Sequence, residues 1–149
     1  MISAARAIII KDNHILLMKR DKFGEQYYTL IGGHVELGES VEKALLREIH
    51  EETMVRVANP RLVYKEQAPK PYGMQYVYLC EFISGIPMLH PKADERKINA
   101  LGLNIYTPMW VPLSQFDGLP FRSKTIHKKL LRHIKNGFPD EVQEFKSTL

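Results

Sequence analysis

The feature that most constrains this sequence is a glycine-rich loop that leads directly into a helix carrying acidic side chains. Gly32 and Gly33 begin the loop, and Glu48, Glu51 and Glu52 follow within the helical stretch. Like charges three and four residues apart repel one another on a helix and lower its stability. This arrangement therefore indicates that the acids serve something other than helix formation.

Helical periodicity places two of the acids on the side of the helix that is expected to be buried. At about 100° per residue, Glu48 and Glu52 fall on the apolar stripe that contains Leu45 and Ile49. Carboxylates that are buried without partners are costly in free energy. A divalent cation is the simplest shared partner, and oxygen ligands suit magnesium, manganese or calcium.

The spacing of these residues resembles the signature of the Nudix hydrolases, G-x5-E-x7-R-E-U-x-E-E-x-G-U, in which U is a bulky aliphatic residue. The match covers residues 33 to 55 and consists of Gly33, Glu39, Arg47, Glu48, Ile49, Glu51, Glu52 and Val55. Met54 stands where the signature has its second glycine. Glycine ends a helix cheaply in the left-handed conformation, and methionine does not. We therefore expect the helix to continue through Met54 or to end in a distorted geometry. The alternative is that Met54 still adopts the left-handed conformation.

The resemblance implies a metal site and the residues that form it. It carries Glu48, Glu51 and Glu52 over as ligands of Mg²⁺, or of Mn²⁺ in its place, and one of the three helps to activate water. The backbone carbonyl of Gly33 is a further candidate ligand. A solvated acidic face is the alternative, but the glycine loop and the apolar stripe argue against it.

The resemblance also implies a structural role for two residues of the motif. In the family, the arginine at the position of Arg47 orients acidic residues, so we expect Arg47 and Glu39 to form a structural pair. An ion pair exposed on the helix surface is the alternative reading. Such pairs contribute little to stability.

Many members of the family take a further acid from a loop distant in sequence. The segment from Ser84 to Asn104 is long and charged, and we expect it to be irregular. It contains Asp94 and Glu95, of which we favour Glu95 as a catalytic group. The alternative is that both acids are simply exposed to solvent.

Candidate substrate contacts lie near the motif. Tyr72 belongs to the loop 68–73, which holds both a tyrosine and prolines, the residue types that mark different subfamilies in this region. Tyr72 is therefore either a base-stacking residue or part of a plain turn, and Tyr27 and Tyr28 are other stacking candidates. His34, next to the glycine pair, is a candidate phosphate contact.

The rest of the sequence predicts an α+β fold. Expected strands span residues 3–10, 14–19, 27–31, 55–58, 61–67, 74–83 and 106–113, and expected helices run from Ser40 to about Thr53 and over about 123–136. The tail after Pro139 is expected to be weakly ordered. This pattern favours a mixed sheet between helices. The resemblance implies an α/β/α sandwich, in agreement.

Composition sets the remaining bounds. A chain of 149 residues fits a single domain, here residues 1–149, with 44% hydrophobic and 26% charged residues. No apolar run approaches the roughly 20 residues of a membrane helix, so we expect a cytoplasmic protein without a membrane partner. Cys80 is expected to be a buried, inert thiol.

A net charge of +4 mildly favours anionic ligands. The positive excess is concentrated in the helix predicted at 123–136, and a solvated face is the better explanation for it. Because this helix lacks the interleaved aromatic residues of single-strand binders, a nucleic-acid partner is disfavoured.

These observations together predict a magnesium-dependent pyrophosphohydrolase. Its substrate would be a nucleoside diphosphate linked to another group, such as a nucleoside triphosphate, a sugar nucleotide, ADP-ribose or a dinucleoside polyphosphate. The alternatives are a nucleotide-binding regulatory module of the same fold that does not hydrolyse its ligand, and an RNA-processing enzyme that uses the basic helix. A homodimer is compatible with the sequence.

Overall fold

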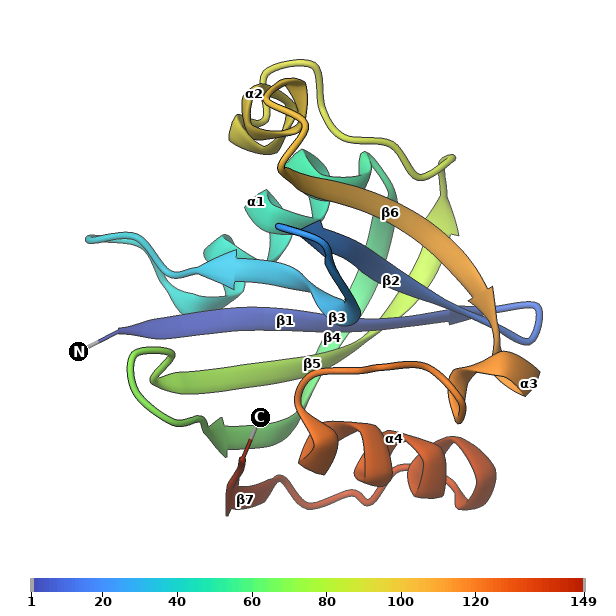
Figure 1. Ribbon diagram of the computed structural model, residues 1–149. Coiled ribbons are helices and arrows are strands. Elements are labelled where there is room, and N and C mark those ends of the chain that lie inside the picture. The colour runs from blue at the N-terminus through green and yellow to red at the C-terminus, as the bar shows by residue number, and fades with distance from the viewer. Residues whose placement is uncertain (1, 149) are drawn as a thin grey trace.

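The centre of the molecule is a mixed seven-stranded sheet in a computed structural model that describes residues 2–148 (Figure 1). The strands are β1 (Ser3–Lys11), β2 (His14–Lys22), β3 (Glu25–His34), β4 (Arg56–Gln67), β5 (Met74–Ser84), β6 (Asn104–Pro112) and β7 (Gln143–Lys146). Their order across the sheet is β6-β2-β3-β1-β5-β4-β7. The pairs β1–β5 and β4–β7 are parallel, and the other neighbours are antiparallel.

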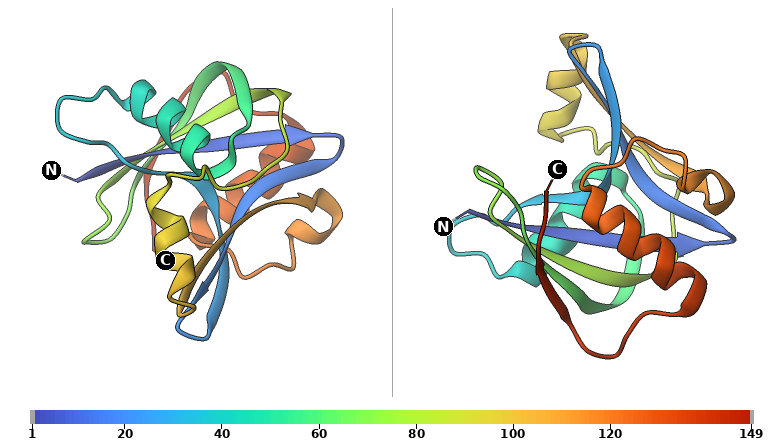
Figure 2. Two further views of the ribbon diagram at one scale, coloured as in Figure 1. Left: turned by 90° about the horizontal axis from the view of Figure 1, so that it is seen from above. Right: turned by 60° about the horizontal axis from the view of Figure 1, so that its bottom comes forward.

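Helices cover both faces of this sheet. They are α1 (Val41–Thr53), α2 (Asp94–Ala100), α3 (Leu113–Phe116) and α4 (Lys124–Asn136). Figure 2 shows α1 and α4 on opposite sides of the strands, with α2 near α1. The fold is therefore the predicted α/β/α sandwich around a mixed sheet. Within the described residues, no helix combines the length and apolar composition needed to cross a membrane.

The central strand β1 explains why the molecule has two hydrophobic cores. Successive side chains of a strand point to opposite faces, and β1 is apolar on both. Ala7 and Ile9 pack with Leu45 on the face covered by α1. Ile8 packs with Leu130 on the face covered by α4. The nearly continuous apolar run of β1 thus matches a strand that is buried on both faces.

The hairpin between β1 and β2 follows from its turn residues. Asp12 and Asn13 have φ angles of 48° and 60°. Both residue types tolerate this left-handed region, which a two-residue hairpin with the favoured twist requires at both positions. The predicted turn at these residues is confirmed.

The C-terminal tail is more ordered than its polar sequence indicates. We expected weak order after Pro139, but β7 pairs with β4 from Tyr64–Gln143 to Gln67–Lys146. The ring of Phe145 meets the buried ring of Tyr64 edge-on, with centroids 5.9 Å apart. A single aromatic anchor and a free sheet edge therefore order a segment that has no strong strand pattern.

A second difference concerns β4. The two short strands expected at 55–58 and 61–67 form one strand, Arg56–Gln67, whose pairing with β5 shifts register at several points. Asn59 has a φ of 50° at the irregular stretch between them. The Asn59–Pro60 pair predicts an interruption, and the strand accommodates it as a local irregularity without ending.

The segment expected to be irregular contains helix α2. Leu89 and Ala93, just before it, are buried. The Asn99 side chain accepts a hydrogen bond from the backbone N–H of Tyr106 at 2.7 Å and donates to its carbonyl at 2.9 Å. These contacts fix both ends of α2. The expectation of an irregular segment is wrong for residues 94–100, because tertiary contacts stabilise a helix too short to form alone.

Helix α1 begins as the sequence predicts. Ser40 is its N-cap, and its side-chain oxygen accepts a hydrogen bond from the backbone N–H of Lys43 at 3.1 Å. Such a cap satisfies one of the amide groups left without a partner in the first turn.

The end of α1 differs from the expectation. Met54 neither continues nor distorts the helix: its φ and ψ are 57° and 12°, in the left-handed region where the family signature has glycine. The exit is fixed by Thr53, whose hydroxyl donates to the carbonyl of Ile49 at 2.6 Å and accepts from the N–H of Val55 at 3.1 Å. Surrounding contacts therefore hold Met54 in a conformation that its side chain disfavours.

Candidate active site

Three carboxylates converge between α1 and α2. Glu48 and Glu52 of α1 and Glu95 of α2 each offer one oxygen, and these oxygens lie within 4.8 Å of one another. Glu48 is 8% exposed and Glu52 is 4% exposed. The prediction that both helix acids point inward is confirmed, and the acid favoured in the distant segment lies beside them.

The glycine pair at the end of β3 lets the strand pass against these acids. A Cβ on Gly33 would stand 2.6 Å from a carboxylate oxygen of Glu48. A Cβ on Gly32 would stand 2.0 Å from the carbonyl oxygen of Ala5. The N–H of Gly32 donates to Glu52 at 2.8 Å. Only glycine permits this close approach of backbone and carboxylate.

Glu95 reaches the cluster because the segment before it is attached to the end of α1. The N–H of Met88 donates to the carbonyl of Thr53 at 3.0 Å, and the N–H of His90 donates to the carbonyl of Glu51 at 2.8 Å. These contacts satisfy carbonyl groups that a helix C-terminus leaves without partners. The same contacts bring α2 and Glu95 over the acids of α1.

Arg47 connects the motif residues into one network. Its guanidinium donates two hydrogen bonds to Glu39, at 2.7 and 3.0 Å, and one to the carbonyl of His34 at 3.1 Å. It also donates to Glu48 at 3.0 Å and to Glu51 at 3.2 Å. The expected pair of Arg47 and Glu39 is present. Arg47 additionally fixes the orientation of the helix acids.

The pKa values of these groups differ in direction. The hydrogen bond from Arg47 lowers the pKa of Glu39 to about 2, and the same pair raises the pKa of Arg47. Burial raises the pKa of Glu48 to about 7. Burial, and then the charge of Glu48, raises the pKa of Glu52 well above its ordinary value. A cation between the carboxylates would lower the pKa values of Glu48 and Glu52 and so favour their ionised forms.

The other predicted residues lie around the cluster. Glu51 turns its carboxylate towards Arg47, and its side chain is 38% exposed, so it is not one of the three converging acids. His34 is exposed at the end of β3. Its hydrogen bond with Arg47 is made by its backbone carbonyl and does not involve the imidazole ring. Tyr72 is 42% exposed and lines a cavity on the other side of the glycine pair.

This cavity has a volume of about 160 Å³. Among the described residues, its charged lining groups are Arg6, Arg20, Arg122 and Glu66. Gly32 joins the cavity to the acid cluster, because its carbonyl accepts from Arg6 at 2.9 Å while its N–H donates to Glu52. The cavity wall and the acid cluster therefore meet at Gly32. Arg122 is paired with Glu25, which leaves Arg6 and Arg20 against the carboxylate of Glu66, and this balance favours an anionic ligand.

Aromatic rings hold two of the arginines in place. The guanidinium of Arg20 lies 3.6 Å from the ring centroid of Tyr106, and that of Arg122 lies 3.9 Å from the ring centroid of Tyr27. Arg20 also donates to the side chain of Asn104. Stacking of this kind restricts a flexible cation to one orientation.

The sequence reasoning missed Arg6 and Glu66. Each sits in an apolar strand, and strand alternation contains the signal that identifies them. Arg6 shares a face of β1 with buried Ile8, and Glu66 shares a face of β4 with buried Tyr64. A charged residue at a buried strand position indicates a polar site.

Comparisons with known proteins agree with this geometry. A family model described as the NUDIX domain matches residues 1–134. The NAD-capped RNA hydrolase NudC of Edwardsiella ictaluri is 36% identical over 84 residues, which are 56% of this chain and 33% of that protein. NudC of Pseudomonas aeruginosa is 28% identical over 127 residues, which are 85% of this chain and 40% of that protein.

The comparison with solved structures agrees on the fold. The crystal structure of a NUDIX hydrolase from Nitrosomonas europaea superposes with a TM-score of 0.72 at 18% identity, covering 99% of this chain and 79% of that one. The chain spans 33% and 40% of the two NudC relatives, so their names do not assign its substrate. The family match extends over most of the sequence and includes the converging acids. The chain belongs to the Nudix hydrolase family.

Proposed function

We propose that this protein is a divalent-metal-dependent pyrophosphohydrolase that cleaves a nucleoside diphosphate linked to another group. The observation that carries the proposal is the convergence of Glu48, Glu52 and Glu95 within 4.8 Å, beside a glycine pair that leaves room for them. An arginine-lined cavity adjoins these acids through Gly32. An acidic metal site next to a cationic cavity suits a phosphorylated substrate.

The acids fit a hard divalent cation. All three offer carboxylate oxygens, and burial raises the pKa of Glu48, despite its hydrogen bond from Arg47, and the pKa of Glu52. We assign Mg²⁺ or Mn²⁺ to Glu48 and Glu52, with the carbonyl of Gly33 and the carboxylate of Glu51 as further ligands. When bound, the cation supplies charge neutralisation at the phosphoryl oxygens and a bound water of lowered pKa.

The remaining steps belong to the chain itself. Glu95 stands on a different element from the other two acids, so it would accept the proton of the attacking water, whereas Glu48 and Glu52 would hold the cation. Arg47 keeps Glu48 in position through a hydrogen bond of 3.0 Å. Arg6 and Arg20 attract and orient the anionic substrate from the cavity side.

A capped RNA is the second candidate substrate. The two relatives described above are named NAD-capped RNA hydrolases. Lys124, Lys128, Lys129 and Arg132 surround a hollow on the outer side of α4 and would suit a phosphate backbone. The sequence disfavours a nucleic-acid partner, whereas the names of these relatives favour one. NAD-capped RNA therefore belongs in any test of substrates.

The test is a substrate panel assayed with magnesium, with manganese and with excess chelator. It contains nucleoside triphosphates, sugar nucleotides, ADP-ribose, dinucleoside polyphosphates and NAD-capped RNA, and it follows release of the nucleoside monophosphate. We expect turnover of at least one member with either metal and none with chelator. Undiminished turnover in chelator would overturn the metal assignment. Nucleotide binding without turnover of any member would instead support the regulatory-module alternative.

A further inference from the structure

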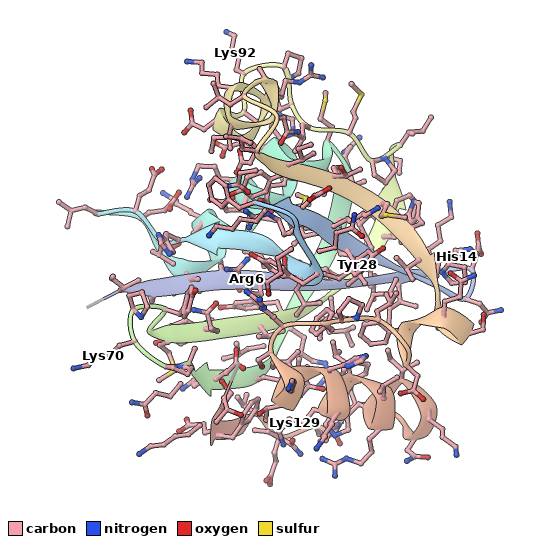
Figure 3. All side chains as sticks on the ribbon, viewed as in Figure 1. Arg6, His14, Tyr28, Lys70, Lys92 and Lys129 are labelled. Carbon is pink, nitrogen blue, oxygen red and sulfur yellow. The ribbon has the colours of Figure 1, made fainter. Side chains whose placement is uncertain are left out.

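A row of polar side chains crosses the face of the sheet that α4 covers. Arg6 of β1 donates from Nε to the side-chain oxygen of Gln75 on β5 at 3.1 Å. Gln75 stands directly opposite Glu66 of β4 in the sheet register. The hydroxyl of Ser123, the N-cap of α4, donates to Oε2 of Glu66. Figure 3 shows Arg6 near the centre of the molecule, between the levels of α1 and α4.

Glu66 is the unusual member of this row. It is 5% exposed, yet no lysine or arginine of residues 2–148 forms an ion pair with it. Among the described residues, the Glu66 carboxylate accepts one side-chain hydrogen bond, from the hydroxyl of Ser123. Glu66 also lines the cavity of about 160 Å³. Buried carboxylates require donors to replace the water they lose. The wall of the cavity therefore presents acceptor capacity that the protein itself does not fill.

Arg20 presents the opposite chemistry to the same cavity. Its Nε is buried and has no hydrogen-bond partner among the described residues, although its other groups contact Tyr106 and Asn104. A buried N–H without an acceptor is as costly as an unsatisfied carboxylate oxygen. The cavity is thus lined by an acceptor, the carboxylate of Glu66, and by the cationic side chain of Arg20.

The size and walls of the cavity suit a planar ring. A protein cavity of about 150 Å³ admits benzene, and this cavity is comparable and opens beside the exposed ring of Tyr72. A nucleobase is the part of a nucleotide that matches such a space. The aromatic ring of Tyr72 and the guanidinium planes of Arg20 and Arg122 are surfaces on which bases stack.

We propose that Glu66 selects guanine, so that the substrate of this enzyme is a guanine nucleotide derivative. Guanine presents two adjacent donors, N1–H and the 2-amino group, to a single carboxylate. Adenine and cytosine place an acceptor nitrogen beside their amino group, and the N–H of uracil lies between two carbonyl oxygens. The O6 and N7 atoms of guanine are acceptors that suit the arginine side chains lining the cavity. Glu66 acts as a specificity-determining residue and takes no part in bond cleavage.

The inference rests on the proposed function for the position of the diphosphate, which would extend past Gly32 to the acid cluster. Base binding itself does not depend on hydrolysis. It is therefore measured with nucleoside monophosphates in excess chelator, by titration calorimetry. This arrangement separates the two proposals, because an inactive protein that still selects guanine would refute only the hydrolysis.

The experiment compares GMP, IMP, AMP and 2′-deoxy-GMP as ligands. IMP lacks the 2-amino group and keeps N1–H and O6. We expect GMP to bind at least tenfold more tightly than IMP and AMP, because a site built to pair with a donor rejects analogues that lack it. 2′-Deoxy-GMP should match GMP within about threefold. This series needs no variant, so it holds even if substitutions at Glu66 impair folding.

The variant series then assigns the selection to Glu66. Glu66→Gln keeps the shape and an oxygen for Ser123 but turns an N–H₂ group towards the ligand. It should reduce the preference for GMP over AMP at least tenfold. Glu81→Gln on β5, an exposed position whose carboxylate accepts from Asn59, is the matched control and should change nothing.

Four results would overturn the proposal. AMP or IMP binding as tightly as GMP would show that the donor edge is not read. An unchanged preference in Glu66→Gln would remove this residue from selection. Affinity lost with the 2′-hydroxyl would show that the carboxylate binds the ribose. Turnover of nucleotides of every base at equal rates, with the metal requirement intact, would refute the guanine inference and leave the proposed function standing.

Discussion

Helices α1 and α4 are built alike and are used differently. Each has 13 residues and begins at a serine whose side chain accepts a backbone N–H of the first turn. Each covers one face of the sheet. The buried residues of α4 are Ile126, Leu130 and His133, whereas those of α1 are Ala44, Leu45, Glu48, Ile49, Glu52 and Thr53. The helices therefore differ mainly in the polar groups that they bury.

The buried polar group of α4 has a protein partner. His133 lies 2.5 Å from the hydroxyl of Tyr64 through Nδ1, and aromatic rings surround the pair. On α1, Glu48 and Glu52 share one hydrogen bond from Arg47 and one from Gly32, and burial still raises the pKa of both. Satisfied groups stabilise a fold, while groups left short of partners mark a site that a ligand completes.

The largest expected effect comes from breaking the α1 site. Glu52→Gln should lower kcat at least a thousandfold, about 4 kcal/mol at the transition state, since a metal ligand is lost. The amide oxygen can still accept from Gly32, so thermal denaturation followed by circular dichroism should show a folded protein. Lys43→Ala, on the exposed face of α1, should keep kcat within about twofold. Full activity in both variants would refute the site.

The second prediction concerns pH in the absence of metal. The folded pKa of Glu48, about 7, exceeds its ordinary value of 4.5, so the folded state binds more protons between these limits. The free energy of unfolding should therefore decrease as pH rises from about 4.5 to 7, by at most about 3 kcal/mol. Urea denaturation in chelator at several pH values measures this change.

Glu48→Gln should reduce that pH dependence, to which Glu52 contributes in the same direction, and Glu81→Gln should leave it unaltered. Helix α4 contributes the opposite trend, because burial lowers the pKa of His133 and makes the folded state less stable as pH falls below 6.5. An unchanged slope in Glu48→Gln would show that the acids of α1 are not destabilising when ionised. The contrast between the helices would then fail.

The third prediction separates the acids that come from different elements. Glu95→Gln should lower kcat at least tenfold with a smaller effect on KM, as expected for a group acting mainly in the transition state. Its neighbour Asp94, exposed on the same short helix, is the matched control, and Asp94→Asn should have a smaller effect. If both variants keep wild-type kcat while Glu52→Gln is inactive, water must be activated by an acid of α1.

Much of the α1 side was predictable because its information is local. Ser40 as the cap and the burial of Glu48 and Glu52 follow from spacing within a single helix and loop, and the pair of Arg47 with Glu39 follows from the family resemblance of the same local motif. Residues three, four and eight positions apart come into contact within α1 and the loop before it, and these contacts do not depend on distant parts of the chain. A motif on one helix therefore specifies both its structure and its chemistry.

The α4 side was less predictable because its contacts join distant parts of the chain. The hydrogen bond between Arg6 and Gln75 spans 69 residues and exists only because β1 and β5 pair in one register. Glu66 meets Ser123 across 57 residues in the same way. Strand alternation marks these side chains as buried, but no local pattern reveals that they line one cavity.

The fourth prediction tests the boundary between local and long-range control at the end of α1. Met54 has a φ of 57°, a conformation that costs a residue with a Cβ roughly 1 kcal/mol relative to glycine. Met54→Gly removes this strain and also removes a half-buried side chain. Met54→Ala removes the same side chain but keeps the Cβ. The difference between the two variants therefore isolates the backbone effect.

We expect Met54→Gly to be about 1 kcal/mol more stable than Met54→Ala in urea denaturation, with kcat at saturating metal unchanged in both. Glycine stabilises a left-handed helix end even though it is more flexible when unfolded, because the steric penalty is larger than the entropy difference. If alanine were the more stable variant, the exit of α1 would have to relax into a right-handed conformation. The contacts of Thr53 with Ile49, Val55 and Met88 would then be too weak to direct the chain. Because the Met88 contact also helps to position α2, such a relaxation would move Glu95 as well, and kcat would fall together with stability.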